Sequence, residues 1–228
     1  MIVSFEFLKT PTFEQEAQII LKGLAQQLQQ AGWKTLVLME NDLASQHDER
    51  LQLIYHNLLN HSEITLSPVS QWLIQLAAFE ARWKQAQSWN HDYSDGIVLY
   101  SHWVDHLFVQ NQAALDQPTV NALWQLVQVA SQNTKPDLTI FLDLAGIKNE
   151  SQNAKHQRYL QQLEIISKNR KAWVFRPVQI IQGKNSDGVM KSLQIMINEI
   201  FQIISQKHQA QLDQELNAFA AHFHSSDD

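Results

Sequence analysis

His102 and His106 lie four residues apart, with Asp105 between them. If this segment is helical, both imidazoles lie on one face of the helix and could bind zinc. The simpler interpretation is a pair of polar residues at the mouth of a cleft, and we therefore predict no metal site. Ser101, His102 and Asp105 are also the residue types of a nucleophilic triad. They lie too close together in sequence for its usual geometry, and no G-x-S-x-G elbow is present.

The segment between the first apolar run and the first helical pattern is a second place where chemistry could be expected. A phosphate loop of the form G-x-x-x-x-G-K-[ST] uses glycines so that backbone N–H groups converge on phosphate. It adds a lysine to neutralise charge and a hydroxyl to ligate magnesium. In this chain the segment reads FLKTPTFE, and the glycine, lysine and hydroxyl positions hold Phe7, Thr12, Phe13 and Glu14. Lys9 is the single cation of the loop, and a carboxylate at the start of the helix disfavours an incoming phosphate. We interpret the stretch as a phosphate site that has been lost.

The composition restricts the classes of function. The 228 residues suffice for one α/β domain with a full core, and 44% of them are hydrophobic. The net charge of -6, without a long basic run, argues against a nucleic-acid partner. The absence of cysteine excludes thiolate metal sites and cysteine nucleophiles and fits a reducing compartment. We see neither a signal peptide nor an apolar run that could span a bilayer, so we expect a cytoplasmic protein without a membrane partner.

Short apolar runs alternate with helical patterns along the chain. The predicted strands are residues 2–5, 35–39, 97–100, 138–142 and 173–175. The predicted helices are residues 12–31, 48–60, 68–89, 104–114, 119–132 and 153–168, with a last helix from about residue 187. This alternation predicts an α/β fold of three layers, in which a five-stranded parallel sheet lies between helices. Ligands of such sheets bind beyond the carboxyl ends of the strands, so the loop after the first strand is the expected site.

The order and spacing of several segments resemble thymidylate kinases over about residues 1–204. That family's opening strand, phosphate loop, first helix and second strand resemble IVSFEFLKTPTFEQEAQIILKGLAQQLQQAGWKTLVL. Its third helix, third strand and catalytic loop resemble LAAFEARWKQAQSWNHDYSDGIVLYSHW, and its fourth strand resembles KPDLTIFLDL. Its last helix–strand pair resembles HQRYLQQL followed by WVF. The resemblance implies a P-loop-NTPase-like domain over residues 1–204 and leaves residues 205–228 as a C-terminal helical extension.

The positions that carry function in that family differ here. The resemblance places its Arg-Glu-Pro motif at Glu40, Asn41 and Asp42, its Asp-Arg pair at Phe79 and Glu80, and its Asp-Arg-Tyr motif at Ser101, His102 and Trp103. Its arginine-bearing lid would fall in residues 145–155, which contain no arginine, whereas Glu6 matches the family. Phosphoryl transfer depends on positioning and on positive charge around the transferred group. We therefore expect no catalytic residue and no phosphoryl transfer.

Three interpretations follow. The first, which we favour, is a thymidylate kinase-like pseudoenzyme that has lost its ATP- and dTMP-binding residues, uses no cofactor and acts by binding. The second is a divergent nucleoside monophosphate kinase that uses ATP and Mg²⁺, with its cations relocated to Lys9, Arg50 and Arg82. The third is a binder of another small ligand in the former nucleotide pocket. The aromatic residues that map to this pocket, and that would fill it or line it, are Phe7, Phe13, Phe79 and Trp103.

The end of the chain carries a further amphipathic pattern. Leu212, Leu216, Phe219 and Phe223 recur at helical spacing and should bury against the same domain, a second copy or a protein partner. Thymidylate kinases are homodimers, so the resemblance implies a homodimer.

Overall fold

The computed structural model describes residues 1–8, 11–39, 65–104, 106–107, 115–143, 154, 158–159, 161, 178–182 and 193–224. The predicted helix at residues 48–60 lies outside these residues, as do most of the predicted helices at 104–114 and 153–168. Lys9, Glu40, Arg50 and nearly all of the lid segment also lie outside them.

A parallel sheet of five strands forms the centre of the molecule, in the order β2-β3-β1-β4-β5. The strands are β1 (Ile2–Glu6), β2 (Thr35–Leu38), β3 (Ile97–Ser101), β4 (Leu138–Asp143) and β5 (Val178–Gln182). β1 lies between β3 and β4, with Phe5 opposite both Ser101 and Ile140. The carboxyl ends of β1 and β3 are therefore neighbours.

Four predicted strands are confirmed by β1 to β4, whereas the position of the last strand differs from the prediction. Residues 173–175 lie outside the described residues, and β5 begins at Val178, directly after Pro177. A proline has no N–H for a strand ladder but is compatible with a position at the start of a strand. The segment VQIIQ is rich in β-branched residues, which favour extended backbone. The sequence analysis instead placed the last strand at residues 173–175, which read WVF.

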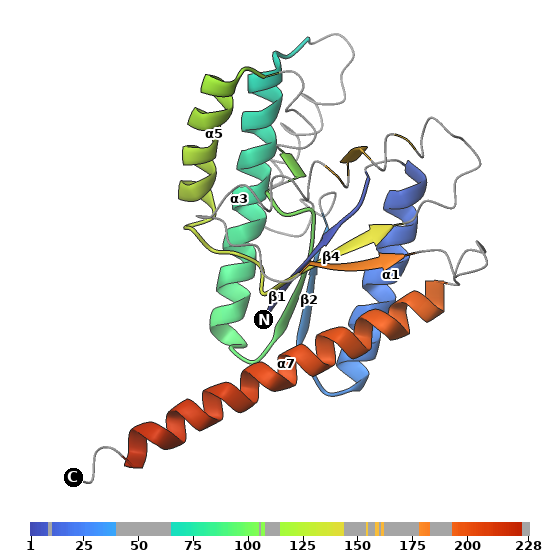
Figure 1. Ribbon diagram of the computed structural model, residues 1–228, viewed down its shortest axis with the longest axis vertical. Coiled ribbons are helices and arrows are strands. Elements are labelled where there is room, and N and C mark those ends of the chain that lie inside the picture. The colour runs from blue at the N-terminus through green and yellow to red at the C-terminus, as the bar shows by residue number, and fades with distance from the viewer. Residues whose placement is uncertain are drawn as a thin grey trace.

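Helices cover both faces of the sheet (Figure 1), with α1 (Pro11–Gln30) and α7 (Leu193–His224) on one face and α3 (Pro68–Asp92) and α5 (Gln117–Ala130) on the other. The predicted helices at 12–31, 68–89 and 119–132 are confirmed to within a few residues. Side chains fix two of the helix starts. Ser67 accepts a hydrogen bond from the Ser70 N–H at 3.1 Å, and Asp116 accepts one from the Thr119 N–H at 2.8 Å. A proline follows each cap in the first turn, where its missing N–H costs nothing.

The two faces of the sheet bury separate hydrophobic cores, because successive strand residues point to opposite sides. Val3 and Phe5 pack with α1 and α7, whereas Ile2 packs with α3 and α5. Ser4 lies on the second side, where its hydroxyl donates to the Thr139 hydroxyl at 2.9 Å. The same alternation directs the side chain of Glu6 away from the α1 side.

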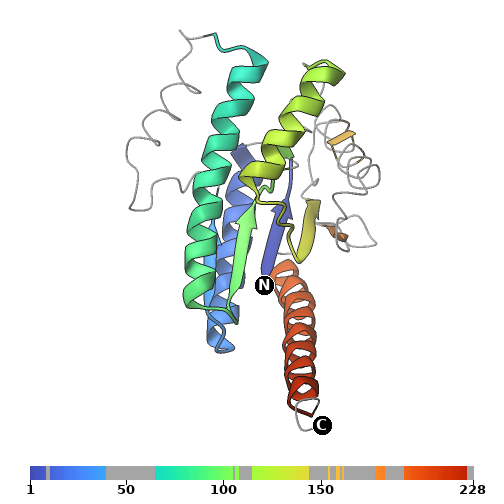
Figure 2. The ribbon, with the colours of Figure 1, turned by 90° about the vertical axis from the view of Figure 1, so that its left-hand side faces the viewer.

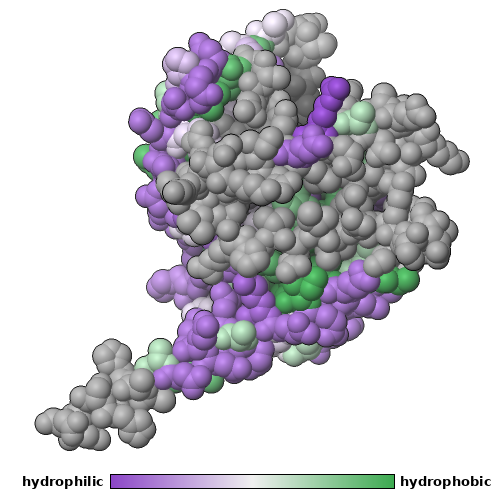
Figure 3. Space-filling view, viewed as in Figure 1, coloured by the Kyte–Doolittle hydropathy of each residue, from purple (hydrophilic) through white to green (hydrophobic). Residues whose placement is uncertain are grey.

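α7 is continuous through residues 204 and 205 and projects beyond the sheet (Figures 1 and 2). Met196, Ile200 and Ile204 are buried in its first half, whereas Leu216 and Phe219 are 66% and 65% exposed. The visible surface of α7 is mainly hydrophilic, with separate hydrophobic residues (Figure 3). The amphipathic pattern predicted for the end of the chain is therefore exposed at Leu216 and Phe219, and these two side chains are not buried against the rest of the domain. None of the helices in the described part of the chain combines the length and apolar character needed to cross a membrane.

His208 on α7 makes stability depend on pH. Its ring is 3% exposed and packs edge-on against Trp33, with ring centroids 5.2 Å apart. Burial lowers the pKa of His208 and the Met1 ammonium lowers it further, while Asp95 and Glu215 act in the opposite direction. Because the pKa in the folded state lies below the unfolded value of about 6.5, the stability contribution is complete above that pH and is lost as the pH falls.

His208→Gln should therefore reduce the fall in unfolding free energy between about pH 7 and pH 5.5, measured by urea denaturation across this range. His91→Gln, at an exposed position, should leave the slope as in the wild type. Parallel pH profiles for the wild type and His208→Gln would contradict this expectation.

Candidate functional site

The candidate site lies where β1 and β3 end. Glu6 is the last residue of β1, and His102 directly follows β3. The His102 N–H donates to the Phe5 carbonyl at 2.9 Å, which extends the pairing of the two strands by one residue. The backbone of His102 then adopts a φ of 55°, a left-handed conformation that is uncommon outside glycine. The chain consequently turns sharply at His102.

A single turn carries His106 back over His102. The His106 N–H donates to the Trp103 carbonyl at 3.0 Å, and the Leu107 N–H donates to the Val104 carbonyl at 3.1 Å. The ring centroids of His102 and His106 lie 3.8 Å apart at an interplanar angle of 33°. The two imidazoles do share a site, but a bend and a turn bring them together, so the helical premise of the prediction is wrong at His102.

Both imidazoles are buried, with exposures of 4% for His102 and 1% for His106. The interpretation as polar residues at a cleft mouth is therefore wrong. Asp105, the third member of the sequence pattern, lies outside the described residues, so the triad-like grouping cannot be placed.

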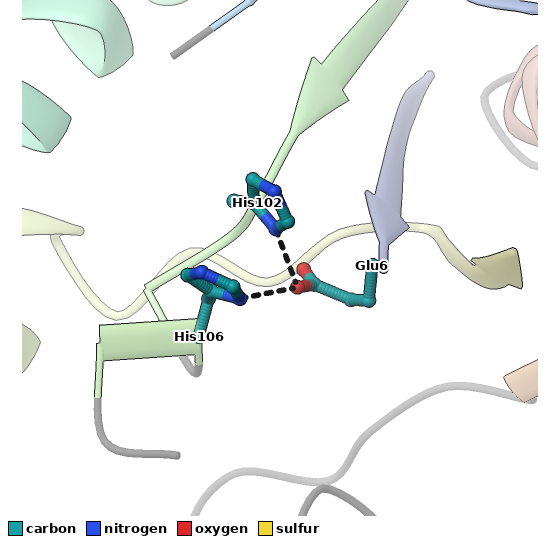
Figure 4. A group of neighbouring side chains, drawn as sticks. All are labelled: Glu6, His102 and His106. Atoms are coloured by element: carbon teal, nitrogen blue, oxygen red, sulfur yellow. Dashed lines mark ion pairs between the residues drawn. The ribbon is translucent and has the colours of Figure 1, made fainter. Parts of the chain in front are cut away.

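The carboxylate of Glu6 faces both imidazoles (Figure 4) and is itself 2% exposed. Its Oε1 accepts a hydrogen bond from the Trp103 N–H at 2.7 Å. Its Oε2 lies 3.5 Å from His102 Nδ1 and 4.0 Å from His106 Nδ1. The Tyr159 hydroxyl contacts His106 Nδ1. A buried carboxylate requires such compensation, because removing a charge from water is costly.

The four aromatic residues assigned to the former nucleotide pocket lie in two separate clusters. Phe7 and Phe13, 1% and 2% exposed, belong to the core beneath α1 and α7. Phe79 and Trp103, both 1% exposed, belong to the core beneath α3 and α5, where their rings meet edge-to-face at 5.1 Å. Phe7 also contacts the His102 ring, with centroids 4.0 Å apart. The sheet thus divides the predicted aromatic set, and each ring is packed inside the protein.

The structure also places four other residues that the sequence analysis named, three of which are charged. Arg82 is 5% exposed, lies 4.9 Å from the Tyr100 ring centroid and donates to the Ser101 carbonyl at 3.2 Å. Glu80 forms a surface ion pair with Lys84 at 2.6 Å. Glu14 lies in the first turn of α1 and is half-buried. Thr12 is in the same turn, and its side chain lies outside the described residues.

The sequence analysis named Glu6 only as a match to the resembled family and did not group it with the histidines, and it did not assign Tyr159. An acidic residue at the end of the apolar run IVSFE was a usable signal, because the alternation of the strand places it on a buried face. Tyr159 lies 53 residues from His106, and no local pattern predicts that contact.

Comparison with known proteins supports the fold. No model of a protein family matches the chain, and no curated protein is similar to it in sequence. Among solved structures, the chain is similar to a thymidylate kinase from Ehrlichia chaffeensis, with a TM-score of 0.58 and 13% sequence identity. The similarity covers 90% of this chain and 98% of that one. At this identity the comparison shows the fold alone: an α/β fold like that of thymidylate kinase.

Proposed function

We propose that the chain is a thymidylate kinase-like pseudoenzyme that binds neither ATP nor dTMP and acts through contacts with protein. The burial of Phe13 carries this proposal. A phosphate loop needs a cation at this position to meet the terminal phosphates. Here the first turn of α1 directs an aromatic ring into the core, where it is 2% exposed.

The charges near the β1–α1 junction also support the proposal. Glu6 is buried at the end of β1, and Glu14 lies at the start of α1, where the helix dipole would otherwise favour an anionic ligand. Burial raises the pKa of Glu16, two residues further along α1. Arg82, one of the cations that a divergent kinase could have relocated, is engaged with Tyr100 and Ser101. Among the described residues of this junction, a nucleoside triphosphate would meet the carboxylates of Glu6 and Glu14.

Calorimetric titration tests the proposal directly. The full chain should give no saturable heat with ATP or dTMP in the presence of Mg²⁺, whereas an active thymidylate kinase under the same conditions should bind both. It should also turn over none of the common nucleoside monophosphates. Saturable micromolar binding or turnover would overturn the proposal and would favour the divergent kinase, for which Lys9→Ala is then the decisive variant.

The proposed protein partner is first of all a second copy of the chain, as the resemblance implies. Leu216 on α7 is an exposed apolar side chain that such a contact would bury. Sedimentation equilibrium should give the mass of two chains, and a mass of one chain would contradict the homodimer.

A further inference from the structure

We propose that Glu6, His102 and His106 form a binding site for one divalent transition-metal ion, with Zn²⁺ as its reference ligand. Each residue offers one donor atom, and these atoms all lie within 4.8 Å of one another. The three side chains come from the ends of two adjacent strands and from the turn that follows them (Figure 4). The proposal does not depend on whether the chain binds nucleotides.

The spacing of the donors suits a small cation. Zinc bonds to imidazole nitrogen and carboxylate oxygen measure about 2.0–2.2 Å, so neighbouring ligand atoms in a tetrahedral site are about 3.4 Å apart. Glu6 Oε2 lies 3.5 Å from His102 Nδ1 and 4.0 Å from His106 Nδ1. A cation between them requires His106 Nδ1 to move closer to the carboxylate.

The donor set indicates the class of metal. Two imidazoles and one carboxylate suit Zn²⁺, Fe²⁺ and similar ions, whereas Ca²⁺ and Mg²⁺ prefer sites made entirely of oxygen. With three protein ligands, a fourth position is left for water or another oxygen. The Tyr159 hydroxyl contacts His106 Nδ1, one of the three donor atoms. A cation bound to His106 Nδ1 would therefore replace the Tyr159 hydroxyl as the partner of this nitrogen.

The surroundings hold the ligands in place. The Trp103 N–H fixes one oxygen of Glu6 at 2.7 Å, so the other oxygen faces the imidazoles. The Phe7 ring covers His102 and keeps its surroundings apolar. The positive φ of His102 is an energetic cost to the fold, and costs of this kind concentrate at functional sites. A cation would also compensate the buried carboxylate.

The competing explanation is a buried hydrogen-bonded cluster that needs no metal. To distinguish the two, the protein should be stripped with chelator and titrated with Zn²⁺, and separately with Co²⁺ while its visible spectrum is recorded. His222→Gln/His224→Gln should be the background for all samples, because the terminal histidines could bind metal weakly. We expect about one ion per chain, a Co²⁺ spectrum typical of low coordination number and a rise in melting temperature with Zn²⁺.

On that background, Glu6→Gln, His102→Ala and His106→Ala should each weaken Zn²⁺ binding by about 100-fold or more, whereas His208→Gln should not change it. His208 is the matched control because it is a buried histidine outside the site. Absence of saturable binding of either ion to the background protein, or an unchanged affinity in all three site variants, would overturn the proposal. If a site variant fails to fold, the Co²⁺ spectrum and the shift in melting temperature of the background protein still decide between a metal site and a hydrogen-bonded cluster.

Discussion

Phe13→Lys is expected to leave most of the protein unfolded at 25 °C, although it introduces the lysine that a phosphate loop carries at this position. The Phe13 ring is 2% exposed and packs in the core between the sheet, α1 and α7. Loss of a buried phenylalanine costs about 3–5 kcal/mol, and an ammonium group in the same place adds several more. The total stability of a domain is only about 5–15 kcal/mol. Circular dichroism and urea denaturation measure the outcome.

Ile19→Lys is the matched control, because it places the same side chain on the same helix at a residue that is 53% exposed. Its unfolding free energy should stay within about 0.5 kcal/mol of the wild type. Phe13→Leu should lose a smaller amount, about 1 kcal/mol, since the site stays apolar. A folded Phe13→Lys protein that binds ATP would show that the ring position opens to solvent, and the pseudoenzyme proposal would then fail.

The sheet could be predicted from local pattern because its central strands β1 and β3 are buried on both faces. Residues 2–5 and 97–100 are almost continuous apolar runs, which is what a strand covered by helices on each side requires. The helix starts were also visible, because Ser67 and Asp116 each precede a proline in the first turn. These signals are local and do not depend on which strands become neighbours.

The candidate site depends on information that is not local. Glu6 meets His102 because β1 pairs with β3 in a register that sets Phe5 beside Ser101. That register follows from the packing of the whole sheet. The conformation of His102, with φ at 55°, also breaks the helical periodicity on which the zinc interpretation relied. The right pair of histidines was therefore singled out for the wrong backbone reason, and Glu6 was not recognised as its carboxylate partner.

The aromatic substitutions illustrate the same limit. The resemblance to thymidylate kinases assigned Phe13 and Trp103 to one pocket, so the sequence suggested that they fill it together. In the structure they belong to cores on opposite faces of the sheet. The proposed loss of nucleotide binding is therefore accompanied by aromatic side chains in two separate cores, and not by one group of rings that fills a single pocket.

Trp103→Ala should lower the free energy of unfolding by about 3–5 kcal/mol, the second-largest effect we expect. The ring is 1% exposed and meets Phe79, Trp83 and Tyr100 in edge-to-face contacts, with centroids 5.1, 5.4 and 5.1 Å away. Each such aromatic pair adds about 0.5–1.5 kcal/mol beyond the buried area. Urea denaturation followed by circular dichroism measures the change.

Trp103→Phe should lose less than Trp103→Ala, because it keeps an aromatic ring among the three neighbours. Leu126→Ala, at a residue of α5 that is 46% exposed, should lose less than about 1 kcal/mol. A loss for Trp103→Ala no larger than that of the Leu126 control would show that the turn after β3 is not anchored by this ring. Because alanine retains the backbone N–H that binds Glu6, a weaker Zn²⁺ affinity in Trp103→Ala but not in Trp103→Phe would mean that the ring positions the turn carrying both histidines. Trp103 would then stabilise the core and orient the proposed metal site through the same contacts.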